Sequence, residues 1–148
     1  MTRLNKHYLP AFKEGIAQHN RDIEQIVNNS AAPDFANTIV ALDKSGELLS
    51  RVSTLFFNVK EANTNDSIDK IAEVVAPLLS QHTDEVYLNE KLFSKVKVVE
   101  DQANKLNLDR EQSRLLEEIY KRFVRGGANL ATDKKEEFKK INTELSLL

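Results

Sequence analysis

Residues 109–127, DREQSRLLEEIYKRFVRGG, contain the signals that decide the fold. Apolar side chains recur there every three or four positions, as they do on one face of a helix. Asp109 precedes the first turn as an N-cap, and Gly126-Gly127 follows the last apolar residue, where glycine commonly ends a helix. The stretch therefore predicts one complete amphipathic helix, whose inward face consists of Leu115, Leu116, Ile119, Tyr120, Phe123 and Val124.

The same helical period recurs on both sides of this stretch. It predicts helices from residues 9–10 to 28–29, from 37–38 to about 62, from 65 to about 88, from 89 to about 103, and from 132–133 to 148. Asn65 and Asn89 are the expected N-caps of the third and fourth helices. Pro77 lies inside the third helix and predicts a kink or a break between residues 74 and 81, because proline lacks the backbone N–H.

Gly46 lies inside the apolar stripe of the second predicted helix. Two interpretations stay open for it. Its small size would let another helix approach closely, or it is a tolerated helical glycine that costs about 1 kcal/mol relative to alanine.

The composition agrees with an all-helical chain. The 148 residues are 41% hydrophobic and include only four Gly and three Pro, fewer than a loop-rich or all-β chain requires. We therefore expect one domain over residues 1–148 that is all-α, an irregular antiparallel array of about six helices.

Charge and cysteine content exclude several classes of function. The 21 basic and 23 acidic residues give a net charge of −2, so we expect no nucleic-acid or membrane partner. The absence of Cys excludes disulfides and thiolate chemistry. No run of residues is long enough to span a bilayer, and the polar start over residues 1–6 is not a signal peptide. These features predict a cytoplasmic protein, or a periplasmic one if a signal peptide is missing from this sequence.

The three histidines do not have the spacing of a metal site. A His-Glu-x-x-His helix places two imidazoles one turn apart on one face. His7 and His19 are twelve positions apart, and His82 belongs to another element. We expect each to be a packing or partly exposed histidine, with no metal bound by this chain.

Other candidate sites are better explained by helix structure. Glu117-Glu118 and Glu136-Glu137 lie among basic residues, as on solvated helix faces with pairs such as Glu117 and Lys121. Gly126-Gly127 follows a helix, whereas a phosphate-binding loop opens one. No serine or threonine has the surroundings of a hydrolase triad. We therefore expect no catalytic or metal-binding residue in this chain.

Several short strings, in their order and spacing, go beyond what helical periodicity explains. They are HYLPAF at 7–12, PDFANTI at 33–39, FFN at 56–58, ANTN at 62–65, YLN at 87–89, LF at 92–93 and FVRGGA at 123–128. Together they resemble the N-terminal region of bacterial peptidyl-dipeptidases, within the thimet oligopeptidase family of zinc metallopeptidases. The resemblance runs from about His7 to Leu148.

This resemblance implies that the chain itself has a non-catalytic role. The zinc site of the family lies far toward the C-terminus, so none of its residues is carried over, and zinc is implied only for a longer parent enzyme. The helical N-terminal region of the family walls a deep channel that admits short peptides. One departure is Glu90, where many members have proline. The implied partners are the catalytic domain of the same parent chain and, as substrates of the parent, short peptides.

The alternative is a free-standing helical module that binds or organises other proteins. The apolar pattern still runs at Leu148, which we interpret as the cut end of a larger protein. A fragment of this kind exposes apolar surface. We therefore expect self-association through the second predicted helix or through the last one, at Phe138, Ile141, Leu145 and Leu148.

Overall fold

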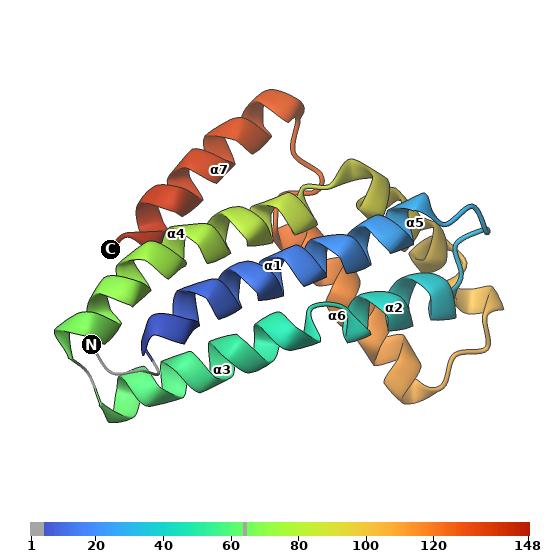
Figure 1. Ribbon diagram of the computed structural model, residues 1–148. Coiled ribbons are helices and arrows are strands. Elements are labelled where there is room, and N and C mark those ends of the chain that lie inside the picture. The colour runs from blue at the N-terminus through green and yellow to red at the C-terminus, as the bar shows by residue number, and fades with distance from the viewer. Residues whose placement is uncertain (1–4, 64) are drawn as a thin grey trace.

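The computed structural model describes residues 5–63 and 65–148, and all regular structure in these residues is helical (Figure 1). The predicted all-α class is therefore confirmed. None of the described helices is long and apolar enough to cross a membrane. The elements are α1 (Asn5–Asn28), the π-helix η1 (Phe35–Val40), α2 (Ala41–Lys44), α3 (Glu47–Ala62), α4 (Asp66–Tyr87), α5 (Glu90–Asp101), the 3-10 turn η2 (Ala103–Lys105), α6 (Arg110–Arg125) and α7 (Thr132–Ser146).

Helix α1 is the centre of the array. Figure 1 shows it between α3 and α4, with α7 along the other side of α4. Helices α5 and α6 pack at the end of the molecule where α1 finishes. Since η1, α2 and α3 together occupy the second predicted helix, the expected array of about six helices is confirmed.

The apolar core consists of two clusters that share α1. The C-terminal half of α1 packs with α5 and α6 in the larger cluster, which includes Ile26, Val96 and Phe123. The N-terminal half packs with α3 and α4 in the smaller cluster, where Phe12 and Phe56 meet edge to face with ring centroids 5.4 Å apart. Each half of α1 therefore belongs to a different part of the core.

Gly15 allows α1 and α3 to pack closely. A Cβ atom at this position would lie 2.9 Å from the Cα atom of Leu49, closer than real carbon atoms approach. Any side chain at residue 15 would therefore push α3 away from α1.

The helix ends follow the expected capping residues. Asn65, Asn89 and Asp109 accept hydrogen bonds from backbone N–H groups in the first turns of α4, α5 and α6. Gly127 adopts a left-handed conformation (φ 93°) after α6. The N–H of Gly127 bonds to the carbonyl of Val124, and that of Ala128 bonds to Phe123, which is the Schellman pattern. These predicted caps are confirmed, although the turn before α4 includes Thr64, which lies outside the described residues.

Two predicted helix starts were wrong. Helix α1 already begins at Asn5, so Pro10 lies inside it and not in its first turn. The second helical segment begins at Phe35 and not at residues 37–38, because Asp34 caps it. The Asp34 side chain accepts from the N–H of Asn37, and the Asn37 side chain accepts from the N–H of Asp34, which closes a reciprocal capping box.

The interruption expected at Pro77 lies elsewhere. Helix α4 continues from Asp66 to Tyr87 with Pro77 inside it, so of the predicted kink or break, the break does not occur. The chain is interrupted instead between α2 and α3, at Ser45 and Gly46, within the second predicted helix. Gly46 has φ 70°, a backbone conformation that side chains with a Cβ rarely adopt. It is therefore a turn residue and not a tolerated helical glycine.

Candidate functional site

The most unusual polar contact of the chain joins two histidines from different helices. His19 on α1 and His82 on α4 lie edge to face, with ring centroids 4.8 Å apart. The Nδ1 atom of His19 is 2.7 Å from Nε2 of His82, and Nε2 of His19 is 3.1 Å from Oγ of Ser45. His82 is 4% exposed, whereas His19 is half-buried. One imidazole contact thus connects α1, α4 and the α2–α3 turn.

The proton positions on both imidazole rings follow from Ser45, the last residue in this chain of hydrogen bonds. Ser45 Oγ lies 2.6 Å from the carbonyl oxygen of Leu42, which can only accept, so the hydroxyl donates there. Ser45 then accepts from His19, which places a proton on Nε2 of His19. A neutral His19 has a bare Nδ1, which accepts from the Nε2–H of His82. The Nδ1 atom of His82 is left as a buried acceptor without a hydrogen-bond partner.

The same turn is held by a carboxylate on α1. The N–H of Gly46 donates to Oδ2 of Asp22 at 3.3 Å, and the side-chain amide of Gln18 donates to Oδ1 at 3.0 Å. A Cβ atom at Gly46 would lie 3.0 Å from the ring of His19. The close approach expected of Gly46 therefore exists, but it is an approach to an imidazole ring at a turn.

Burial keeps both imidazoles neutral. Loss of solvation, with a smaller contribution from the neighbouring His19, lowers the pKa of His82 to about 4. Burial also lowers the pKa of His19, although the carboxylate of Asp22 acts in the opposite direction. At neutral pH the pair therefore carries no charge.

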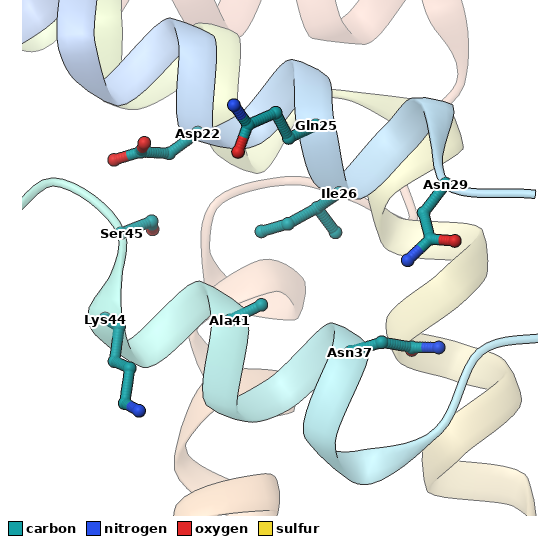
Figure 2. Close-up of a pocket in the computed structure, with 8 residues that line it drawn as sticks. All are labelled: Asp22, Gln25, Ile26, Asn29, Asn37, Ala41, Lys44 and Ser45. Carbon is teal, nitrogen blue, oxygen red and sulfur yellow. The ribbon is translucent and has the colours of Figure 1, made fainter. Parts of the chain in front are cut away.

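Two small cavities lie beside this pair. One, of about 160 Å³, lies between the α2–α3 turn, α4 and α6, and His19, Asp43, Ser45, Tyr87, Arg122 and Phe123 line it. The other, of about 320 Å³, lies between the C-terminal half of α1 and the η1–α2 segment. Figure 2 shows Ile26 on α1 and Ala41 on α2 facing each other across it, with Lys44 pointing away from α1. Ser45 lies beside His19 in the smaller cavity, but its hydroxyl donates to the Leu42 carbonyl and accepts from His19, so His19 is not placed to act as its base.

A second buried polar contact fixes α7. Asp84 on α4 is 5% exposed, and its Oδ1 atom accepts from the side-chain amide of Asn142 at 2.8 Å. Its Oδ2 atom is buried without a partner. Burial raises the pKa of Asp84, while the Asn142 hydrogen bond and the charge of Lys139 act in the opposite direction. This contact positions a helix and has no acid or base partner for chemistry.

The structure also places the other residues that the sequence offered as candidate site residues. His7 is exposed on α1. The glutamate pairs form exposed ion pairs within their own helices, and Glu117 lies 2.6 Å from Lys121, as predicted. Within residues 5–63 and 65–148, no three His, Asp or Glu side chains gather as a metal would require. The two contacting histidines therefore do not fit a zinc site, because they bond to each other and lack a third ligand.

The His19–His82 contact was missed because the two residues are 63 positions apart. The available signal was burial. His82 continues the α4 stripe of Ile71, Val75 and Val86, and His19 lies between Phe12 and Ile26 on the inward face of α1. Periodicity thus placed both rings toward the interior, but it gave no information about their mutual distance.

The geometry of these contacts does not show which proteins this chain is related to, whereas comparison with known proteins does. The chain is 46% identical over 142 residues to a dipeptidyl carboxypeptidase of Salmonella typhimurium, and 44% identical over 144 residues to that of Escherichia coli. The chain is related in sequence to bacterial dipeptidyl carboxypeptidases. Oligopeptidase A of Salmonella typhimurium is more distant, at 22% identity over 143 residues. No family model matches the chain.

These matches differ in how much of each protein they cover. They include 96–97% of this chain but only 21% of each dipeptidyl carboxypeptidase. The chain thus spans about a fifth of the length of these relatives. The resemblance to peptidyl-dipeptidases found in the short sequence strings is therefore confirmed over nearly the whole chain.

Proposed function

We propose that this chain is the non-catalytic, N-terminal helical part of a zinc metallo-oligopeptidase that releases dipeptides from the C-termini of peptides. The match of 96% of the chain to a fifth of a dipeptidyl carboxypeptidase carries this proposal. The remaining four-fifths of such an enzyme would contain the zinc site and be the main partner of this chain. The compartment we propose is the cytoplasm, or the periplasm if a leader precedes this sequence.

The proposed role of the helices is to wall the substrate channel and restrict access to short peptides. This role requires stiffness and shape, and no reactive side chain. Helix α1 is held on two sides by α3 and α4, and Gly15 allows the α1–α3 contact to be tight. Capping residues begin α4, α5 and α6. A wall of this kind selects substrates sterically, since a peptide must reach a buried metal to be cleaved.

A chimeric enzyme tests this proposal. This chain would replace the matching fifth of the Escherichia coli dipeptidyl carboxypeptidase, to which it is 44% identical. We expect the chimera to retain zinc-dependent release of dipeptides, with kcat/KM falling steeply from short peptides to long unfolded ones and no cleavage of folded proteins. A folded chimera whose kcat/KM does not depend on peptide length would contradict the channel-wall role.

The matched control uses the corresponding fifth of oligopeptidase A, which is only 22% identical to this chain. We expect that control to lose most activity, because its helix surfaces are not complementary to the recipient. Equal activity of the two chimeras would show that the surface of this chain is not specific for a dipeptidyl carboxypeptidase.

Exposed apolar side chains also support the second candidate function, a free-standing helical interaction module. Leu55 and Phe57 on α3, and Ile141 and Leu145 on α7, are exposed. Burial of such side chains contributes roughly 1.5–3 kcal/mol each, so a covering partner or a second copy would be stabilising. Sedimentation of the 148-residue chain at micromolar concentration tests whether a second copy of the chain covers these side chains. A monomer at all concentrations would remove the case for self-association.

A further inference from the structure

Three segments that are distant in the sequence meet at the His19–His82 pair, and they meet between the two apolar clusters. His19 lies on α1 between Phe12 of the smaller cluster and Ile23 of the larger one. His82 lies on α4, between Val75 of the smaller cluster and Val86 of the larger one. Ser45 brings the α2–α3 turn to the same point. Whatever changes this contact changes how the turn is attached to the core.

The hydrogen-bond directions leave no position for an additional proton. A proton on Nδ1 of His82 would become a buried donor without an acceptor, which is unfavourable. A proton on Nδ1 of His19 would face Nε2 of His82 at 2.7 Å, so His82 would have to carry its own proton on Nδ1 and become the same unpaired buried donor. The closed arrangement is therefore compatible only with two neutral rings.

The charged and titratable groups around the pair do not remove this restriction. Asp22 on α1 favours a charged His19, but its oxygens already accept from Gly46 and Gln18. Asp43, Tyr87 and Arg122 line the cavity beside His19, from α2, α4 and α6 respectively. Of these, the positive charge of Arg122 opposes a positive charge on the histidine pair.

We propose that the His19–His82 pair is a proton-operated latch, which holds the Ser45–Gly46 turn on α1 and α4 while both rings are neutral and releases the turn when the pair takes up a proton. Release would break the His19–Ser45 hydrogen bond and expose Nδ1 of His82 to water. The start of α3 would then loosen, since Gly46 is the N-cap residue of this helix. This device is independent of the proposed peptidase role.

The direction of the pH effect follows from the pKa of His82, which lies near 4 in the closed state against 6.5 for a free histidine. The open state takes up a proton below pH 6.5, whereas the closed state does not. The latch is therefore stable above pH 6.5 and weakens as the pH falls toward 4, by about tenfold for each pH unit per histidine.

Amide hydrogen exchange of the 148-residue chain tests the latch. Exchange at residues 45–50, corrected for the intrinsic effect of pH, would be compared between pH 7.5 and pH 5. We expect protection at the Gly46 and Ser50 amides to fall by about tenfold or more at the lower pH. Protection in α6 should change much less.

Two histidine-to-glutamine variants make the test specific. Glutamine at position 82 keeps an N–H near the place of Nε2 but cannot titrate, so H82Q should reduce the loss of protection at pH 5 to the part that His19 contributes. H7Q changes the exposed histidine of α1 and should retain it. An equal loss of protection in H82Q and the wild type, or no loss in the wild type, would overturn the proposal.

A second measurement does not require a variant. Nitrogen-15 NMR of the imidazole rings at pH 7.5 should show both His19 and His82 as Nε2–H tautomers. An Nδ1–H tautomer of His19 would contradict the hydrogen-bond directions on which the latch depends.

Discussion

Helices α6 and α7 each have an apolar stripe in the sequence but different environments in the molecule. Helix α6 buries Leu116, Ile119 and Phe123 in the larger apolar cluster. Helix α7 buries only Lys135, whereas Ile141 and Leu145 on the same helix are exposed, Leu145 by 58%. An apolar stripe thus identifies the face of a helix that is suited to burial, but not whether this chain covers it.

The two helices also differ in how they are attached. Helix α6 begins with a reciprocal capping box and ends with a Schellman motif. Helix α7 has Ala131 as N-cap residue, which makes no side-chain cap hydrogen bond. Its contacts with the rest of the fold include the 3.0 Å ion pair of Lys135 with Glu90 and the Asn142–Asp84 hydrogen bond. Glu90, the departure from the family pattern, therefore contacts α7 through this ion pair.

The largest expected effect is the replacement of Phe123 by alanine. This side chain is 1% exposed and packs against Tyr87 and Phe93. Its removal leaves a cavity, so we expect Phe123→Ala to lower the free energy of unfolding by about 3–5 kcal/mol. Urea unfolding monitored by circular dichroism measures this loss. A loss of less than 1 kcal/mol would contradict the assignment of α6 to the core.

The difference in capping predicts two smaller changes in stability, one for each helix, and these changes have opposite signs. Asp109→Ala removes the bond to Gln112 N–H at the start of α6 and should cost about 1 kcal/mol. Ala131→Asp places a carboxylate at the start of α7, where Ala131 already has extended dihedral angles, and should stabilise by about 0.5–1 kcal/mol. Thermal unfolding of both variants checks the pair of signs. Stabilisation by Asp109→Ala would contradict the capping box.

Asp84 predicts a pH dependence in the attachment of α7. Because burial raises its pKa, the folded protein holds the proton more tightly than the unfolded chain does. The resulting stability is present at acidic pH and is lost as the pH rises through the raised pKa. Asp84→Asn should remove this loss and stabilise the protein at pH 7 by about 0.5–1 kcal/mol.

Unfolding free energies between pH 4 and pH 7 measure this effect. The control is Asp101→Asn, because Asp101 is exposed at the end of α5. This variant should leave the pH dependence unchanged. A stability that rises less with pH in Asp84→Asn than in the wild type would show that the carboxylate is stabilised in its ionised form.

The smallest expected effect concerns the exposed face of α7. Leu145→Gln should change the free energy of unfolding by less than about 0.5 kcal/mol, since the side chain leaves little apolar contact behind. The matched substitution Leu116→Gln on α6 should cost several times more, because Leu116 is 2% exposed. Equal losses of unfolding free energy in the two variants would contradict the difference in burial between the two helices.

Local sequence signals predicted most of the helices and their caps. Asn65, Asn89, Asp109 and Gly126-Gly127 act through hydrogen bonds to neighbouring residues, so their roles can be recognised from the sequence alone. The reciprocal pair Asp34 and Asn37 belongs to the same class, and a search for capping boxes would have found the start at Phe35.

Features that depend on tertiary contacts could not be predicted in the same way. Pro77 suggested a break, but the helix continues through it, and the interruption occurs at Gly46 beside the ring of His19. Likewise, the contact between His19 and His82 depends on how α1 and α4 pack. From the sequence, each ring was expected to be packing or partly exposed, and nothing indicated that the two rings meet.

The division of α1 between two apolar clusters has a consequence for how the chain can be cut. Each cluster needs one half of α1, and a covalent helix cannot melt at one end without weakening its other end. The two parts should therefore unfold in one cooperative transition and share a single melting temperature. A split at the turn between α2 and α3 would give two pieces of which only the first contains α1. The second piece would lack the α1 side chains of both clusters until the first rejoined it, so the two pieces should behave as a complementation pair.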